Sequence, residues 1–164
     1  MKNTTSPKIR METSNGAMLM ELWPDAAPRT CEHILALVAD GFYDGLTFHR
    51  IIPGFVLQAG CPNGDGTGGA GHTIPAEFND RPHDKGVLSM ARSADPDSAS
   101  SQFFICLTRN HCQHLDGQYT AFGRVVEGLD TVDKLAATPL RHRDSGTPIH
   151  PPQILHATIV ENEK

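Results

Sequence analysis

The chain has little of what a membrane-spanning or secreted protein requires. Its longest uninterrupted apolar run covers only residues 34–39, far short of the ~20 residues that a bilayer-spanning helix needs. The first residues, MKNTTSPKIRMETSNG, contain neither an apolar core nor a small-residue cleavage site typical of a secretory signal. We therefore expect no membrane contact and a cytoplasmic location.

Paired cysteine motifs are also missing. The four cysteines contain no C-x-x-C pair, and a reducing compartment would keep them as thiols. Buried free thiols are the favoured interpretation, with a disulfide or a zinc site as the alternatives. None of the nine histidines is spaced as H-x-x-x-H on an expected helix, and His111, Cys112 and His114 lie in an expected loop. We therefore interpret that group as a chance cluster and expect no metal site.

The charge pattern argues against nucleic acid as a partner. The chain carries 14 basic and 19 acidic residues, a formal net charge of −5, and no run of five like charges. A surface that follows a phosphate backbone needs clustered Lys and Arg. We therefore expect no nucleic-acid partner.

The size and composition indicate one turn-rich globular domain. The 164 residues include 15 glycines and 12 prolines, with 38% hydrophobic and 20% charged residues, which is the range of folded chains rather than low-complexity ones. A chain of this length favours a single core. We predict a flexible tail at residues 1–7 and one domain at 8–164.

The hydrophobic periodicity predicts eight short strands and two helices. Alternation on both sides of Asn15-Gly16 indicates a β-hairpin. The other expected strands cover residues 47–52, 55–60, 86–92, 102–107, 120–126 and 154–161, and the expected amphipathic helices cover residues 28–41 and 129–137. This pattern favours a mainly β fold: a closed eight-stranded antiparallel β-barrel capped by two α-helices, since closure removes exposed sheet edges.

A glycine-rich segment at residues 64–69 matches G-x-G-x-x-G literally. The residues that follow, His72-Thr-Ile-Pro75, cannot easily begin the helix that would hold a pyrophosphate, and no Lys-Ser/Thr pair follows. A glycine-rich surface loop is therefore favoured over a nucleotide site.

Alternation along the strand at residues 47–52 predicts Phe48, Arg50 and Ile52 on one face. His49 is then expected on the opposite face. A buried, hydrogen-bonded structural role is favoured for it, and a direct catalytic part is the alternative.

The strand at residues 102–107 combines polar and aromatic side chains. Gln102 and Phe104 point one way, and Phe103 and Ile105 the other. Either Phe103 and Ile105 face the core and the first pair forms a binding surface, or both faces are core and tolerate one glutamine. Amides, apolar groups and an arginine without a nucleophile suit the binding of an extended peptide.

Several short motifs along the chain, taken in order, carry a resemblance to a known protein family. They are FHRIIPGF at residues 48–55, Gln58, LSMA at 88–91, SQFFI at 101–105, LDG at 115–117 and FGRVVEG at 122–128. Together, over about residues 10–161, they strongly resemble the cyclophilin family of peptidyl-prolyl cis-trans isomerases, most of all its bacterial-type single-domain members. The resemblance implies an eight-stranded antiparallel barrel capped by two helices.

The resemblance also implies a site. Arg50 would be the catalytic residue, and no cofactor would be needed. The implied substrate-binding residues are Phe55, Val56, Gln58, Ala91, Arg92, Gln102, Phe104, His114, Leu115 and Tyr119. The implied partners are proline-containing peptides and folding proteins, and we expect a monomer.

Four of these residues depart from the family pattern: Val56 replaces methionine, Arg92 asparagine, Tyr119 histidine, and His114 the tryptophan that contacts cyclosporin in drug-sensitive members. We therefore expect cyclosporin to bind with reduced affinity. The alternative function is a non-catalytic adaptor that holds proline peptides. The presence of Arg50 favours catalysis, because an adaptor needs the pocket but not the cation.

Overall fold

The computed structural model describes residues 6–160. The predicted tail at residues 1–7 therefore falls outside the described residues except for its last two. The described elements, in chain order, are β1 (Lys8–Thr13), β2 (Gly16–Leu22), α1 (Pro28–Ala39), β3 (Phe48–Ile52), β4 (Val56–Ala59), β5 (Val87–Met90), β6 (Phe103–Cys106), α2 (Arg109–Cys112), a 3-10 turn (Gln113–Leu115), β7 (Ala121–Glu127), α3 (Leu129–Ala136), β8 (Leu140–His142), β9 (Thr147–Pro148) and β10 (Ile154–Val160).

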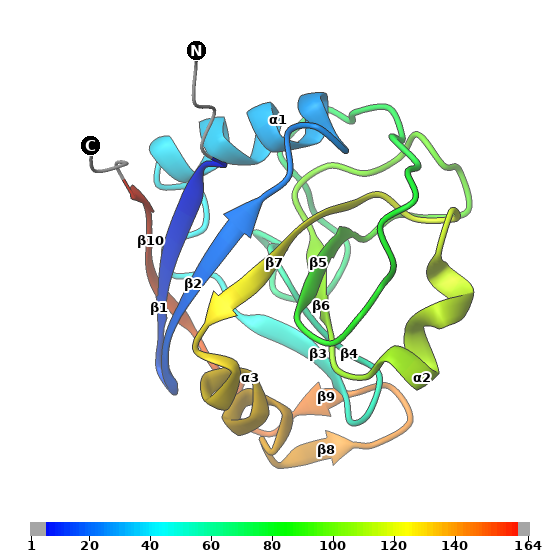
Figure 1. Ribbon diagram of the computed structural model, residues 1–164. Coiled ribbons are helices and arrows are strands. Elements are labelled where there is room, and N and C mark those ends of the chain that lie inside the picture. The colour runs from blue at the N-terminus through cyan, green and yellow to red at the C-terminus, as the bar shows by residue number, and fades with distance from the viewer. Residues whose placement is uncertain (1–5, 161–164) are drawn as a thin grey trace.

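Eight of the strands form one antiparallel sheet in the order β10-β1-β2-β7-β5-β6-β4-β3 (Figure 1). All eight strands predicted from periodicity are present, including the hairpin of β1 and β2, in which Thr13 pairs with Gly16. Gly16 adopts φ +130°, a conformation that side chains other than glycine rarely adopt. The prediction of a mainly β, eight-stranded antiparallel fold is confirmed.

The structure does not show the closed barrel that we predicted, because the two edge strands do not form a ladder with each other. The edge strands β3 and β10 approach at an isolated bridge between Thr47 and Gln153, and the amide of Phe48 donates to the carbonyl of Pro152 over 2.9 Å. Pro151 and Pro152 precede β10 and have no N–H to donate, so pairing cannot continue along β3. The sheet is a curved half-barrel.

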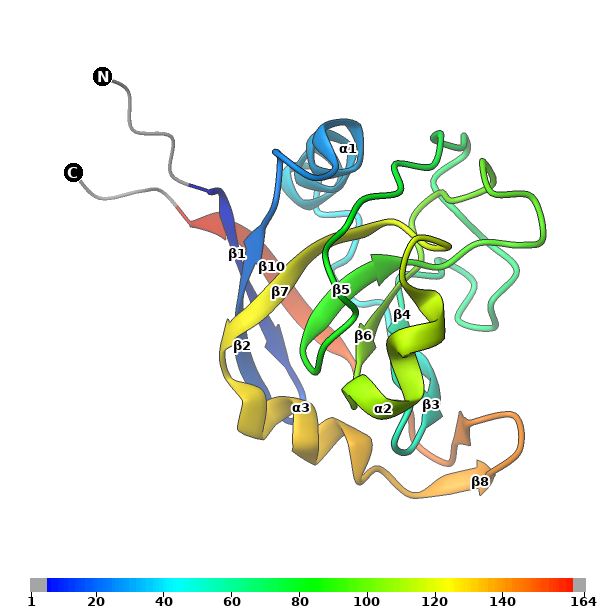
Figure 2. The same cartoon turned by 45° about the vertical axis from the view of Figure 1, so that its right-hand side comes forward.

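Helices α1 and α3 lie at opposite ends of the curved sheet (Figures 1 and 2), as predicted. In α1 the buried side chains include Cys31, Ile34 and Val38, which share one face of a helix. Helix α2 and the small β8-β9 sheet were not predicted. With 12 residues, α1 is the longest helix within residues 6–160, and no helix there has the length and apolar character needed to cross a membrane.

The buried side chains form two clusters on opposite faces of the sheet. The larger lies inside the curve and includes Phe103 and Ile105. The smaller lies on the face toward α2 and includes Val56, Phe104 and Leu115. Strand β6 is therefore buried on both sides, and its outer side forms the base of the site described next.

Candidate active site

Three neighbouring strands align the polar and aromatic side chains that the sequence singles out. In the register of β3, β4 and β6, Arg50 is opposite Gln58 and Gln58 is opposite Phe104. Directly opposed residues in an antiparallel sheet project from the same face. Arg50, Gln58 and Phe104 therefore project from one face of the sheet.

A β-bulge in β3 corrects two predictions of side-chain direction. The register shifts between Phe48 and Arg50, so that Phe48 pairs with Ala59 and His49 is the extra residue. Phe48 therefore packs in the larger core cluster rather than beside Arg50. His49 lines the same cavity as Arg50 instead of the opposite face. A bulge has this effect because one inserted residue reverses the alternation.

His49 is not the hydrogen-bonded structural histidine that we expected. Within residues 6–160 its buried Nδ1 atom has no hydrogen-bond partner. Burial, and then the charge of Arg50, lower the pKa of His49 below its ordinary value. Both effects favour the neutral form of the imidazole beside Arg50.

A cavity of about 640 Å³ opens on this face of the sheet. Nine of the predicted site residues line it: Arg50, Phe55, Val56, Gln58, Ala91, Arg92, Phe104, Leu115 and Tyr119. Its wall therefore combines aromatic and aliphatic groups with a guanidinium and an amide at the rim. That composition suits a compact apolar ring joined to a polar backbone.

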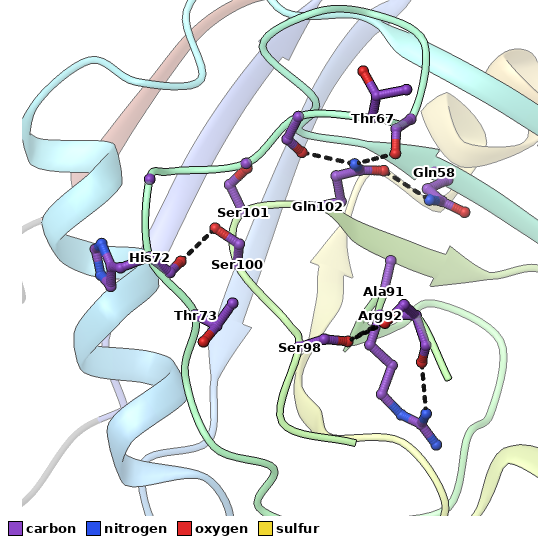
Figure 3. A pocket seen from close by; sticks show the side chains of 15 residues that line it. Gln58, Thr67, His72, Thr73, Ala91, Arg92, Ser98, Ser100, Ser101 and Gln102 are labelled. Atoms are coloured by element: carbon purple, nitrogen blue, oxygen red, sulfur yellow. Dashed lines mark hydrogen bonds between the residues drawn. The ribbon is translucent and has the colours of Figure 1, made fainter. Parts of the chain in front are cut away.

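A chain of side-chain hydrogen bonds links the cavity to its neighbour. Arg50 Nη1 donates to Gln58 Oε1 over 3.2 Å, and Gln58 Nε2 donates to Gln102 Oε1 over 3.0 Å. Gln102 Nε2 in turn donates to the carbonyls of Gly66 and Gly68, each over 2.9 Å. Figure 3 shows Gln102 between Gln58 and the loop that carries Thr67. The predicted site residue Gln102 thus orients the amide beside the cation.

The second cavity, of about 480 Å³, adjoins the first. Gln102 lines it, and Gln58, Gly66, Ala91 and Arg92 line both cavities. The two cavities therefore form one groove across the sheet. Its two adjoining chambers offer room for a chain longer than one residue, as expected of a site for extended peptides.

The glycine-rich loop, which we had assigned to the surface only, takes part in the site. The Cys61 thiol accepts the backbone amides of Gly66 and Gly68 at 3.3 and 3.2 Å. Burial alone would raise the pKa of Cys61, but the backbone amides around its sulfur outweigh burial and lower it. This arrangement orients the carbonyls of Gly66 and Gly68 toward Gln102. The literal glycine motif located the loop, but nothing in it indicated the contact with Gln102.

Three of the predicted site residues make contacts around the aromatic wall. His114 does not line the larger cavity but stacks on Phe55, with ring centroids 5.9 Å apart and an interplanar angle of 22°. The Arg92 guanidinium lies 4.4 Å from the centroid of Tyr119. Tyr119 meets Phe104 edge to face at 5.8 Å. All ten predicted binding residues therefore lie in or beside one groove.

Asp116, next to Leu115 of the cavity wall, is an ion-pair centre that the sequence reasoning missed. Arg109 donates to both of its carboxylate oxygens, at 3.0 and 2.7 Å. This bidentate contact, together with a hydrogen bond from His83, lowers the pKa of Asp116 to about 2. The loop that carries Leu115 is thus tied to α2 by a charged contact.

This contact predicts a specific acid dependence of stability. The unfolded chain has the higher Asp116 pKa and binds more protons between its ordinary value of 3.8 and about 2. The contribution of Asp116 to stability is therefore complete above about pH 5 and is lost as the pH falls toward 2. After solvent screening we expect it to be about 1 kcal/mol. Urea unfolding between pH 5 and 2.5 should show a correspondingly shallower decline for Asp116→Asn than for the wild type.

The matched control is Asp133→Asn, which removes a more exposed carboxylate paired with Lys85 at 2.9 Å. It should leave the acid dependence nearly as in the wild type. Equal slopes for Asp116→Asn and the wild type would contradict the assignment.

The groove, with its apolar cavity, amide chain and guanidinium, has the composition of a site for an extended peptide. The family model for "Cyclophilin type peptidyl-prolyl cis-trans isomerase/CLD" matches residues 8–159. The chain belongs to this family and is a peptidyl-prolyl cis-trans isomerase.

Known relatives agree with this assignment. The chain is 51% identical over 138 residues to a peptidyl-prolyl cis-trans isomerase of Synechococcus elongatus, covering 79% of this chain and 93% of the relative. It is 53% identical over 112 residues to peptidyl-prolyl cis-trans isomerase B of Bacillus subtilis, covering 67% and 76%. A cyclophilin-type isomerase of Cryptosporidium parvum, solved in the presence of the dipeptide Ala-Pro, superposes with a TM-score of 0.87 at 34% identity, over 94% of this chain and 99% of that one. The adaptor alternative is not favoured.

Proposed function

We propose that the protein accelerates rotation about Xaa-Pro bonds in folding proteins, with Arg50 as the catalytic cation and the cavity bounded by Phe55, Phe104 and Leu115 as the prolyl subsite. The observation that carries the proposal is the position of Arg50: its guanidinium lies at the rim of an apolar cavity and is held there by Gln58 over 3.2 Å. The structure of the Cryptosporidium parvum relative was solved in the presence of the dipeptide Ala-Pro, which supports a proline-containing ligand for this protein.

The chemistry follows from the electronic structure of the amide. Rotation about the bond must overcome ~18–20 kcal/mol, because the nitrogen lone pair is delocalised into the carbonyl. In the twisted state this lone pair is localised on nitrogen and can accept a hydrogen bond. A guanidinium that donates to the prolyl nitrogen therefore stabilises the twisted state more than either planar isomer, which is the condition for catalysis.

The two arginines of the cavity differ in the number of hydrogen bonds that their guanidinium groups already donate within the protein. Arg92 donates to the carbonyls of Ser93 and Gln118 at 2.9 and 2.8 Å and lies over Tyr119. Arg50 donates one side-chain hydrogen bond among the described residues, to Gln58. A guanidinium has five N–H groups, so Arg50 retains donors for substrate. This difference supports Arg50 rather than Arg92 as the catalytic residue.

The proposal extends to the cellular setting. We expect a monomer, since residues of one chain complete the groove. We expect the cytoplasm, since the four cysteines are buried free thiols, the state that a reducing compartment maintains. Assistance to protein folding follows from the chemistry, because uncatalysed prolyl isomerisation takes tens to hundreds of seconds and limits folding.

Exchange NMR on a short Ala-Pro-containing peptide tests the proposal. Catalytic amounts of protein should produce exchange cross-peaks between the cis and trans signals, and the same protein should shorten the slow phase of a proline-limited refolding reaction. Binding of the peptide without exchange would support the adaptor instead. Exchange that Phe104→Ala leaves unchanged would contradict the assigned prolyl subsite.

A further inference from the structure

A chain of three polar side chains, two of them fully buried and the third, Asp116, partly exposed, lies behind the cavity and is not part of its lining. His83 Nε2 lies 2.9 Å from Ser89 Oγ, and His83 Nδ1 lies 3.0 Å from Asp116 Oδ1. The same carboxylate oxygen accepts the backbone amide of His83 over 2.8 Å. His83 and Ser89 are both 0% exposed. Two hydrogen bonds therefore hold the imidazole in one orientation, and a third holds the backbone of the same residue.

The order Ser, His, Asp matches that of a hydrolase triad, but the geometry excludes nucleophilic catalysis. A nucleophile must reach its substrate, and Ser89 is fully buried in the centre of the sheet, opposite Phe104. These hydrogen bonds therefore do not activate Ser89 as a nucleophile.

The hydrogen-bond partners determine the protonation state of His83. Ionised Asp116 can only accept, so Nδ1 carries the proton and Nε2 accepts from the Ser89 hydroxyl. Burial lowers the pKa of His83, the nearby charges of Arg109 and His114 lower it further, and Asp116 opposes them. The ring is therefore neutral, with its proton on Nδ1.

One face of this imidazole supports the aromatic wall of the cavity. The His83 and Phe104 rings are stacked with centroids 6.3 Å apart and an interplanar angle of 21°. Phe104 also meets Tyr119 edge to face at 5.8 Å. The Phe104 ring, which lines the cavity, thus lies between a locked imidazole and the cavity rim.

We propose that His83 is a positioning residue of the isomerase: held by Asp116 and Ser89, it keeps the Phe104 ring in the orientation that receives the prolyl ring. This inference rests on the proposed prolyl subsite. Because the ring contact is made in the planar and in the twisted state alike, loss of positioning weakens substrate binding and leaves the rotation step intact. His83 thus acts on KM, whereas Arg50 acts on kcat.

The test uses His83→Ala, His83→Gln and His83→Asn. Alanine removes both the ring and its hydrogen bonds, and we expect KM for the Ala-Pro peptide to rise about tenfold, with kcat within about twofold of the wild type. Glutamine places a flat amide at the depth of Nε2, in reach of Ser89 and beside Phe104, and should keep KM within about threefold. Asparagine reaches only the Nδ1 position and Asp116, and its KM should exceed that of the glutamine variant severalfold.

Two further variants separate the possible failures. His156→Ala removes a surface histidine that contacts Asp44 at the same 3.0 Å distance, and it should leave KM unchanged. Phe104→Ala tests the prolyl subsite itself: if it leaves KM unchanged, the proposed subsite fails, and the inference fails with it.

If Phe104→Ala raises KM, the prolyl subsite stands. If folded His83→Ala then leaves KM unchanged, or lowers kcat alone, only the positioning role of His83 is overturned. Should His83→Ala fail to fold, the pair of amide variants decides. A KM for His83→Asn clearly above that of His83→Gln supports the inference, and equal values or the reverse order overturn it.

Discussion

Arg50→Ala is expected to lower kcat on the order of 100-fold or more, the usual effect of removing one preorganised donor to a transition state. The loss corresponds to about 2.7 kcal/mol of transition-state stabilisation. Fold stability should change little, because Arg50 is only half-buried and bonds to Gln58 alone among the described side chains. Exchange NMR or a coupled peptide assay measures kcat, and thermal unfolding checks the fold.

Arg92→Ala is the matched control, since it removes a second guanidinium from the same cavity. Both terminal nitrogens of Arg92 donate to backbone carbonyls, so we expect an effect on KM and at most a few-fold change in kcat. A folded Arg50→Ala protein that isomerises peptides at near the wild-type rate, or an equal loss of kcat in both variants, would contradict the assigned mechanism.

The second large effect concerns cyclosporin and depends on His114. An imidazole buries less apolar surface than an indole, and each Å² of buried surface that is lost costs ~25 cal/mol of binding free energy. It also does not place an N–H where the indole does, and the loss of that hydrogen bond costs ~0.5–1.5 kcal/mol. We therefore expect cyclosporin to bind roughly 10- to 1000-fold more weakly than to tryptophan-bearing relatives. His114→Trp should recover much of this affinity, measured by calorimetry or by inhibition of isomerisation.

Peptide turnover should separate from drug affinity in the same variant. His114 stacks on the outer side of Phe55 and does not line the larger cavity, so His114→Trp should leave kcat/KM for a short proline peptide within a few-fold. A useful comparison is Tyr119→His, which alters the part of the wall that contacts Phe104. Tight cyclosporin binding by the unmodified protein, or no gain in His114→Trp, would show that another residue supplies the contact.

The strand pattern was predictable because its signals are local. The Asn15-Gly16 turn, the alternation in β1 and β2 and the helical spacing of Cys31 and Ile34 each depend on a few neighbouring residues. The same holds for the direction of Phe103 and Phe104, which adjoin in sequence and belong to opposite core clusters. A regular alternation of apolar and polar residues, however, does not indicate where a β-bulge interrupts the strand. The bulge at His49 therefore reversed the predicted directions of Phe48 and His49.

The family motifs placed the site residues, and the structure shows how these residues depend on distant parts of the chain. Arg50 reaches Gln102 through Gln58, and Gln102 depends on the carbonyls of Gly66 and Gly68. The glycine segment was visible in the sequence, yet its contact with Gln102, just before β6, joins residues more than 30 positions apart. Pairings of that separation are created by the sheet order and have no local pattern.

The sequence by itself determined the eight strands of the main sheet, helices α1 and α3, and the identity of the groove residues, because alternation, turn residues and ordered motifs are properties of short segments. Only the tertiary structure decided that the sheet stays open at Pro151 and Pro152, that His49 joins Arg50, and that His83 supports Phe104 from behind. Each of these depends on which segments meet across the sheet, and burial then selects the protonation state and orientation of the side chains that meet there.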